Sequence, residues 1–213
     1  MTPESVTAIL IGLGIACGCL YFVAFCFRPP SLAKSVIKVL SVTPLACASW
    51  AMGAPGLLTF ALGASSAGDL FLSRKGDSAF AIGAVFFGLA HLAYIRLMAP
   101  GGLDVSWTLP TYCILGLAAV MTILILINAD SMRVVAIGYI AILTTLGLVA
   151  VQLPDELALA RGAAAMFILS DTVLGLDRFV LSLGPAARVG VSYLIWGTYF
   201  AATLLFFLAF ALL

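Results

Sequence analysis

Two aspartates lie inside apolar segments of membrane-spanning length, each within a similar short sequence motif. Asp69 stands in Gly-Asp-Leu-Phe-Leu at 68–72, and Asp171 stands in Ser-Asp-Thr-Val-Leu at 170–174. A carboxylate at the centre of a membrane costs about 2.5–3.5 kcal/mol on insertion scales, so it marks a functional site by default. Two neighbouring carboxyls do not easily both ionise, so one can donate a proton while the other stabilises a cation or activates water. This division suits acid-catalysed cleavage of an ether or acetal.

Other functions are open to this pair of residues. Each aspartate could cap a helix or form an ion pair with a basic residue such as Lys38 or Arg178. Paired intramembrane carboxylates also serve proton-coupled transport, and a lipid-binding protein or a polytopic scaffold would need no chemistry from them. We favour the interpretation that the two aspartates act as an acid and a base, because their sequence motifs match and because few polar residues could complete a transport path. Asp171 follows Ser170, a hydrogen-bonding residue, which favours Asp171 as the more stabilised anion.

Other polar residues could support or replace this chemistry. His91 is the single histidine, whereas a catalytic zinc site needs three protein ligands, so we predict no metal site. His91 then makes a polar contact in the bundle or lines a cavity. Ser66 and Ser170 precede the aspartates without a Gly-x-Ser-x-Gly elbow, so we expect packing or hydrogen bonding rather than nucleophilic attack. Lys38 extends to the interface or meets a phosphate.

We expect the substrate to contact a set of polar residues that includes Lys38, Ser66, His91 and Ser170. Four tyrosines complete this set. They are Tyr94, Tyr139, Tyr193 and Tyr199. Aromatic side chains in membrane helices also serve as packing residues or interface anchors, so lining a lipid pocket is the less common of their two functions.

The composition predicts the elements that position these residues. Of 213 residues, 64% are hydrophobic and 9% are charged, which is typical of an integral membrane protein. The net charge of +1 gives no indication of nucleic-acid binding, and the cysteines lie in apolar runs as small hydrophobic residues. No basic residue precedes the first apolar run, which argues against a cleaved leader.

Eight apolar segments are each close to the ~20 residues that cross a membrane. We therefore predict an all-α, polytopic bundle of eight transmembrane helices in a single domain, 1–213. The expected helices cover 5–27, 35–52, 56–73, 78–98, 107–128, 132–152, 158–176 and 187–211. The similarity of the two aspartate motifs also favours an arrangement of two four-helix repeats.

Basic residues indicate the orientation. Arg96 and Arg161 lie at one set of helix ends, and the other lysines and arginines lie at the opposite set. By the positive-inside rule the richer set is cytoplasmic, so both termini face away from the cytoplasm. Both aspartates then lie roughly 6–8 Å inside the cytoplasmic boundary. We expect the inner membrane of a bacterium.

Two motifs resemble those of the YhhN family of lysoplasmalogenases. The first is Phe80-x-x-Gly83-x-x-x-Phe87-x-x-x-His91-x-x-Tyr94, preceded by Ser66-x-Gly68-Asp69. The second is Gly162-x-x-x-x-Phe167-x-x-Ser170-Asp171-x-x-Leu174-x-x-x-Arg178-Phe179. Lys38 with Thr43-Pro44 and Trp196-x-x-Tyr199 are similar to the second and last helices of the family, although Thr203 stands where the family often has Gln.

The resemblance implies hydrolysis of the vinyl ether bond of lysoplasmalogens, which releases a fatty aldehyde and glycerophosphoethanolamine or glycerophosphocholine. It implies no cofactor, and its partners are the lysophospholipid substrate and membrane lipids. The chemistry agrees with the residues: protonation of the vinyl β-carbon gives an oxocarbenium ion, which a carboxylate can stabilise. The phosphate head group would lie near the basic cytoplasmic rim.

Overall fold

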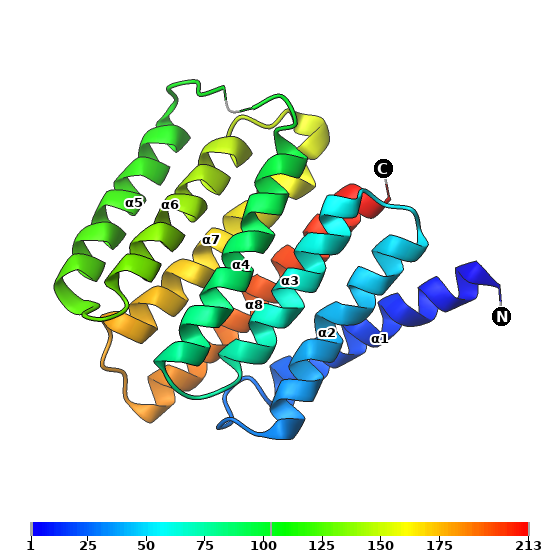
Figure 1. The fold of residues 1–213 in the computed structure, drawn as a ribbon, viewed down its shortest axis with the longest axis horizontal. Coiled ribbons are helices and arrows are strands. Elements are labelled where there is room, and N and C mark those ends of the chain that lie inside the picture. Colours follow the sequence, from blue (N-terminus) through cyan, green and yellow to red (C-terminus); the bar gives the residue numbers. More distant parts are fainter. Residues whose placement is uncertain (1, 103, 213) are drawn as a thin grey trace. The chain divides into compact units, whose positions relative to one another are not determined.

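The chain folds into eight α-helices and one short 3₁₀ helix within residues 2–102 and 104–212, which the computed structural model describes (Figure 1). The helices are α1 (Pro3–Ala24), α2 (Leu32–Ala51), α3 (Gly56–Leu72), α4 (Asp77–Met98), α5 (Leu109–Asn128), α6 (Arg133–Ala150), α7 (Ala158–Phe179) and α8 (Pro185–Ala211), with η1 (Asp155–Leu157) before α7. The prediction of an all-α bundle of eight helices is confirmed. The predicted helix ends differ from these by a few residues.

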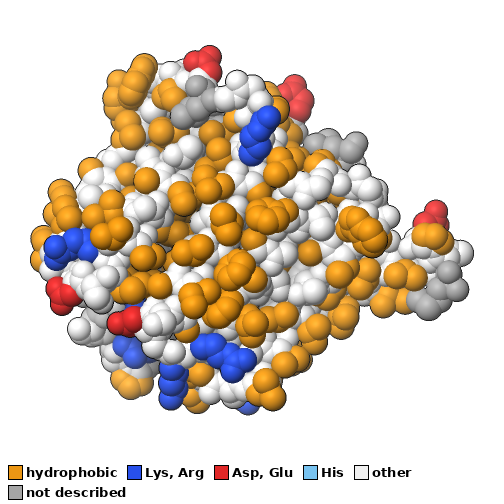
Figure 2. Space-filling model, viewed as in Figure 1, with side chains coloured by type: hydrophobic (Ala, Val, Ile, Leu, Met, Phe, Trp, Pro, Cys, Tyr) orange, Lys and Arg blue, Asp and Glu red, His pale blue; other side chains and the backbone are white. Residues whose placement is uncertain are grey.

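Seven of the helices are long and apolar enough to cross a membrane, and α3, with 17 residues, is shorter. A length of 17 residues is at the lower end of the range of about 17–25 that spans a hydrocarbon core. Figure 2 shows apolar side chains spread over the visible surface, and large apolar residues are exposed on many of the helices. Because such a surface suits lipid rather than water, the chain is a polytopic membrane protein.

Local signals in the sequence set the ends of several helices. The side chain of Thr2 accepts a hydrogen bond from the Ser5 amide before α1, and Ser31 accepts one from the Lys34 amide before α2. Both are N-caps, which satisfy amides that have no partner within the helix. Gly76, in the turn between α3 and α4, has a φ of 98°, which a residue with a Cβ rarely adopts.

The residues form two compact units. The first comprises residues 2–94 and 206–212, and the second comprises residues 95–205. The first unit therefore contains α1, α2, α3, most of α4 and the end of α8. The second contains α5, α6, α7 and the greater part of α8.

In the first unit, a series of polar contacts joins α2 to α3. These two helices run antiparallel, so the contacts follow one another along the interface. The pairs are Ser35 with Ser73 at 2.6 Å, Lys38 with Asp69 at 2.8 Å, Thr43 with Ser66 at 2.6 Å, and Ser49 with Thr59 at 2.8 Å. Polar contacts of this kind join helices in a membrane, where apolar side chains gain nothing by leaving lipid. We call this series the α2–α3 polar ladder.

The helix that carries Asp69 also packs closely against α4. A Cβ added at Gly68 would lie 2.6 Å from the ring of Phe87, and one at Gly83 would lie 2.9 Å from Leu72. Both glycines therefore permit a backbone approach that alanine would obstruct. The packing of α3 on α4 thus places Gly68, the residue next to Asp69, against α4.

In the second unit, the interface of α6 and α7 is largely apolar. Gly147 of α6 lies against the side chains of Ile114 and Ile168. The Tyr139 hydroxyl of α6 contacts Asp171 of α7 through a hydrogen bond. This interface therefore combines apolar packing with a polar contact at Asp171.

Candidate functional site

Asp69 lies on α3 and is fully buried. Its Oδ1 is 2.8 Å from Nζ of Lys38 on α2, whose side chain is 13% exposed. The Lys38 ammonium also lies 6.0 Å from the centroid of the Tyr21 ring on α1, at the outer limit of a cation–π contact. The ion pair favours the ionised form of Asp69, because a neutral acid would leave a buried ammonium without its counter-charge. Lys38 thus points inward instead of extending to the interface.

Ser66 lies one helical turn before Asp69 and is also buried. Its hydroxyl shares a hydrogen bond with Thr43 at 2.6 Å and lies 3.4 Å from the Val39 carbonyl oxygen. Both contacts are with α2, so Ser66 joins the two helices at the level beside the ion pair. These contacts are of the packing and hydrogen-bonding kind that the sequence favours for Ser66 over nucleophilic attack.

His91 and Tyr94 are both fully buried on α4. They are three residues apart, so they lie on the same face of the helix. The Tyr94 ring stacks on Phe206 with centroids 4.0 Å apart and planes 11° apart. Ser65 of α3 is fully buried in the same unit. Tyr94 therefore has a packing contact in addition to its expected function at the substrate.

Asp171 lies on α7 and is half-buried. The Tyr139 hydroxyl donates a hydrogen bond of 2.6 Å to its Oδ2. A neutral hydroxyl can donate to either a carboxylate or a carboxylic acid, so this contact positions Asp171 in both protonation states. Tyr139, predicted as a substrate contact, is thus placed to orient the second aspartate.

The Ser170 hydroxyl does not serve Asp171 as we expected from the sequence. It donates its proton to the Ile195 carbonyl oxygen on α8 at 3.0 Å. Because a hydroxyl has a single proton to donate, this contact removes the basis for choosing Asp171 as the more stabilised anion. The ion pair of Asp69 with Lys38 points to the opposite assignment.

Phe167, about one turn before Asp171 on α7, packs against an aromatic residue of α8. Tyr199 is buried, with its ring centroid 5.7 Å from Phe167 in an edge-to-face arrangement and 5.3 Å from Trp196. Tyr193, one of the expected substrate contacts, is half-buried on α8. Tyr199 therefore has the packing function that is common for aromatic side chains in membrane helices.

One neighbour of Lys38 and one neighbour of Ser66 were not predicted as site residues. Tyr21, on α1, lies near Lys38, and Thr43 holds Ser66. Thr43 belongs to the Thr-Pro motif at 43–44 that resembles the family, whereas no motif or spacing in the sequence identified Tyr21. Within residues 2–102 and 104–212, no group of three or more His, Cys, Asp or Glu side chains could hold a metal ion.

The sequence matches the YhhN family over residues 33–210, and the chain belongs to this family. The matched range contains both aspartates together with Lys38 and Tyr139. No curated protein and no solved structure matches the chain.

Proposed function

We propose that this member of the YhhN family hydrolyses the vinyl ether bond of lysoplasmalogens. The products are a fatty aldehyde and glycerophosphoethanolamine or glycerophosphocholine. The observation that carries the proposal is the buried ion pair of Asp69 with Lys38, at 2.8 Å inside a membrane-embedded unit. An intramembrane anion fixed in this way, in a chain with a second intramembrane aspartate, supports cleavage that passes through a cation.

The two aspartates take different parts in the reaction. Asp171 donates its proton to the β-carbon of the vinyl ether; the carbon–carbon π electrons form the new C–H bond and an oxygen lone pair forms the oxocarbenium ion. The Asp69 carboxylate stabilises this cation and accepts a proton from the water that attacks it. The resulting hemiacetal then collapses: its hydroxyl proton moves to the leaving glycerol oxygen, and the aldehyde departs. Asp69 then releases its proton to water and Asp171 takes one from water, which restores the starting state.

The membrane setting is part of the proposal. Arg28 lies in the turn between α1 and α2, and Lys34 lies in the first turn of α2. Arg74 and Lys75 lie in the turn between α3 and α4. By the positive-inside rule these turns are cytoplasmic, in the inner membrane of a bacterium, with both termini on the other side. Asp69 is close to the end of α3 that leads into a basic turn, so the phosphate head group would lie on the cytoplasmic side.

The direct test is aldehyde release from a defined lysoplasmalogen by the purified protein. The saturated alkyl-ether lysolipid is the substrate control, because it has no double bond to protonate. We expect release from the vinyl ether alone, and loss of that release in Asp69→Asn and in Asp171→Asn. Asp104→Asn, an exposed aspartate outside the helices, is the matched control and should keep full activity. A folded protein that releases no aldehyde would contradict the proposal and favour proton-coupled transport or lipid binding.

A further inference from the structure

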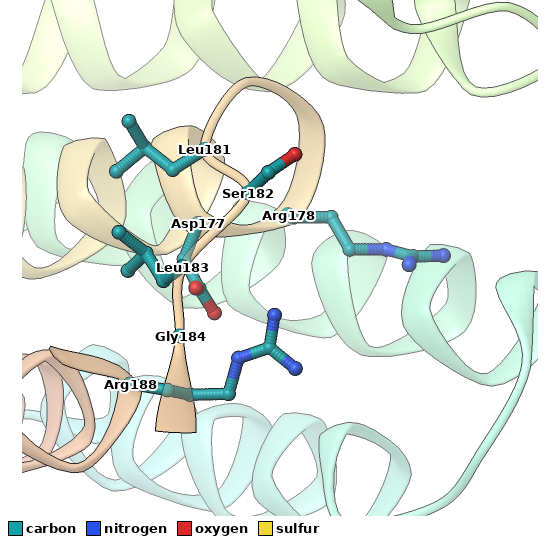
Figure 3. A pocket seen from close by; sticks show the side chains of 7 residues that line it. All are labelled: Asp177, Arg178, Leu181, Ser182, Leu183, Gly184 and Arg188. Carbon is teal, nitrogen blue, oxygen red and sulfur yellow. The ribbon is translucent and has the colours of Figure 1, made fainter. Parts of the chain in front are cut away.

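The turn between α7 and α8 forms a hollow of about 610 Å³. Asp177 and Arg178 line it from the last turn of α7, Ser182 and Gly184 from the turn itself, and Arg188 from the first turn of α8. Figure 3 shows the Asp177 carboxylate and the Arg188 guanidinium facing the same opening, with the Arg178 side chain extending past them. All these residues belong to the second unit. A carboxylate and guanidinium groups therefore share one hollow.

Asp177 lines this hollow, and one of its two carboxylate oxygens lacks a donor in the described part of the chain. Its Oδ1 is buried and has no hydrogen-bond partner within residues 2–102 and 104–212. Buried carboxylate oxygens are almost always satisfied by a donor, because an unsatisfied one loses its hydration without compensation. A ligand that brings an N–H group, best a charged one, would satisfy it.

Arg188 offers donors for an anion in the same hollow. Arg188 is exposed, and a guanidinium matches the geometry of phosphate oxygens with paired N–H groups. Helix α8 begins at Pro185, directly after Gly184. The unpaired amides and the positive dipole end of a long helix add to the attraction for an anion at this place.

We propose that this hollow binds the phosphoethanolamine head group of a membrane lipid. The phosphate lies at Arg188 and the start of α8, and the primary ammonium donates to Asp177 Oδ1. A choline head group carries the same charges but has no N–H donor, so the buried acceptor discriminates against it. The head group belongs either to the lysolipid substrate, an assignment that rests on the proposed function, or to a bulk diacyl lipid of the membrane.

The binding test uses the full-length protein and alkyl-ether lysolipids, which the proposed reaction does not cleave. Affinities for the ethanolamine and choline forms are compared by native mass spectrometry. We expect the wild-type protein to prefer the ethanolamine form by about tenfold, the usual effect of one charge-assisted hydrogen bond. Asp177→Asn should lose this preference, and Arg188→Gln should weaken both forms. Arg133→Gln, an exposed arginine at the start of α6, is the matched control.

Equal affinity of the wild-type protein for the two head groups would overturn the proposal. So would a preference that survives in Asp177→Asn, since Asp177 and Arg188 would then be surface charges with no ligand. Because this arm needs no turnover, it decides the head-group site even if no aldehyde is released and the proposed function fails.

A kinetic arm distinguishes the two sources of the head group. If the substrate supplies it, Arg188→Gln raises KM for the ethanolamine lysoplasmalogen about tenfold and leaves kcat unchanged, as expected for uniform binding. If a bulk lipid supplies it, KM is unchanged and Arg188→Gln instead loses co-purified diacyl phosphatidylethanolamine. Both results support the site, and absence of both effects contradicts it.

Discussion

Asp69 and Asp171 lie in similar sequence motifs, but their surroundings in the structure differ. Asp69 is fully buried and contacts the Lys38 ammonium at 2.8 Å. Asp171 is half-buried and accepts a hydrogen bond from the Tyr139 hydroxyl at 2.6 Å. A charged partner favours the anion, whereas a hydroxyl serves both protonation states. The chemistry that each aspartate can perform is thus determined by the helix that faces it, rather than by the sequence motif around it.

The two interfaces differ in the same sense. The α2–α3 polar ladder fixes the helix of Asp69 at several levels. The interface of α6 and α7 combines the hydrogen bond from Tyr139 to Asp171 with close apolar packing around Gly147. Polar contacts specify one register of two helices, because a slip would leave hydrogen-bonding groups unsatisfied in lipid. We therefore expect the ladder to hold the helix of Asp69 in one fixed register with α2.

The largest expected effects concern the proposed acid, Asp171, and the proposed base, Asp69. Asp171→Asn should lower the rate of aldehyde release by about 10²–10⁴-fold, the usual contribution of a general acid. An acid must be protonated to act, so the residual activity of Asp171→Asn should no longer fall as the pH rises. A base must be ionised, so Asp69→Asn should no longer lose activity as the pH falls. Measured pH–rate profiles in which both variants lose the same limb would contradict the assignment.

Lys38 allows a test of the ion pair through stability. Lys38→Met removes one partner of a buried pair, which typically destabilises by about 3–5 kcal/mol. The double variant with Asp69→Asn removes the uncompensated charge and should recover most of this loss. The free energy of unfolding in mixed micelles, measured over the full cycle of variants, gives the coupling between the two residues. Purely additive effects would indicate that the pair does not stabilise Asp69 as an anion.

The contact of α3 with α4 offers a pair of matched glycines. Gly68→Ala would place a methyl group 2.6 Å from the Phe87 ring, whereas a Cβ at Gly63 meets nothing within 4 Å. We expect Gly68→Ala to destabilise the protein by about 1–3 kcal/mol, the range for overpacking. Gly63→Ala, on the same helix, should be neutral or slightly stabilising. Thermal unfolding of both variants checks this, and equal behaviour would mean that α3 and α4 are not closely apposed.

The smallest effect is expected on the side of Asp171. Tyr139→Phe removes one hydrogen bond to the carboxyl and keeps the ring, so it should reduce kcat about tenfold with little change in stability. Tyr112→Phe removes an exposed tyrosine hydroxyl in the same unit and serves as the control. If Tyr139→Phe were as inactive as Asp171→Asn, the hydroxyl would have a direct part in the reaction beyond orienting Asp171.

The sequence predicted the helices more fully than the contacts between them. Apolar runs of spanning length suffice for the number of helices, because the membrane permits little else. The end of α7 was placed too early, at residue 176, because the polar pair Asp177-Arg178 resembles a turn. The helix instead continues to Phe179. This extra turn carries two of the residues that line the hollow.

The choice of partners was less accessible. Apolar residues on every side of a membrane helix leave its rotation undetermined, so the sequence alone did not indicate that Ser170 faces Ile195 rather than Asp171. The pairing of Asp69 with Lys38 was one of the stated alternatives, since both residues were expected at a similar depth. The proximity of Tyr21 to Lys38 depends on the packing of α1, which no motif describes.

Under the proposed function, the short length of α3 has a consequence for how a lipid would reach Asp69. A helix of 17 residues covers about 25 Å, whereas the hydrocarbon core is about 30 Å thick. Hydrophobic mismatch of this kind draws the bilayer surface inward around the shorter helix. Asp69 is within one turn of the end of α3, so local thinning brings the head-group layer close to its carboxylate. A single-chain lipid could then present the bond next to its glycerol without drawing its phosphate into hydrocarbon.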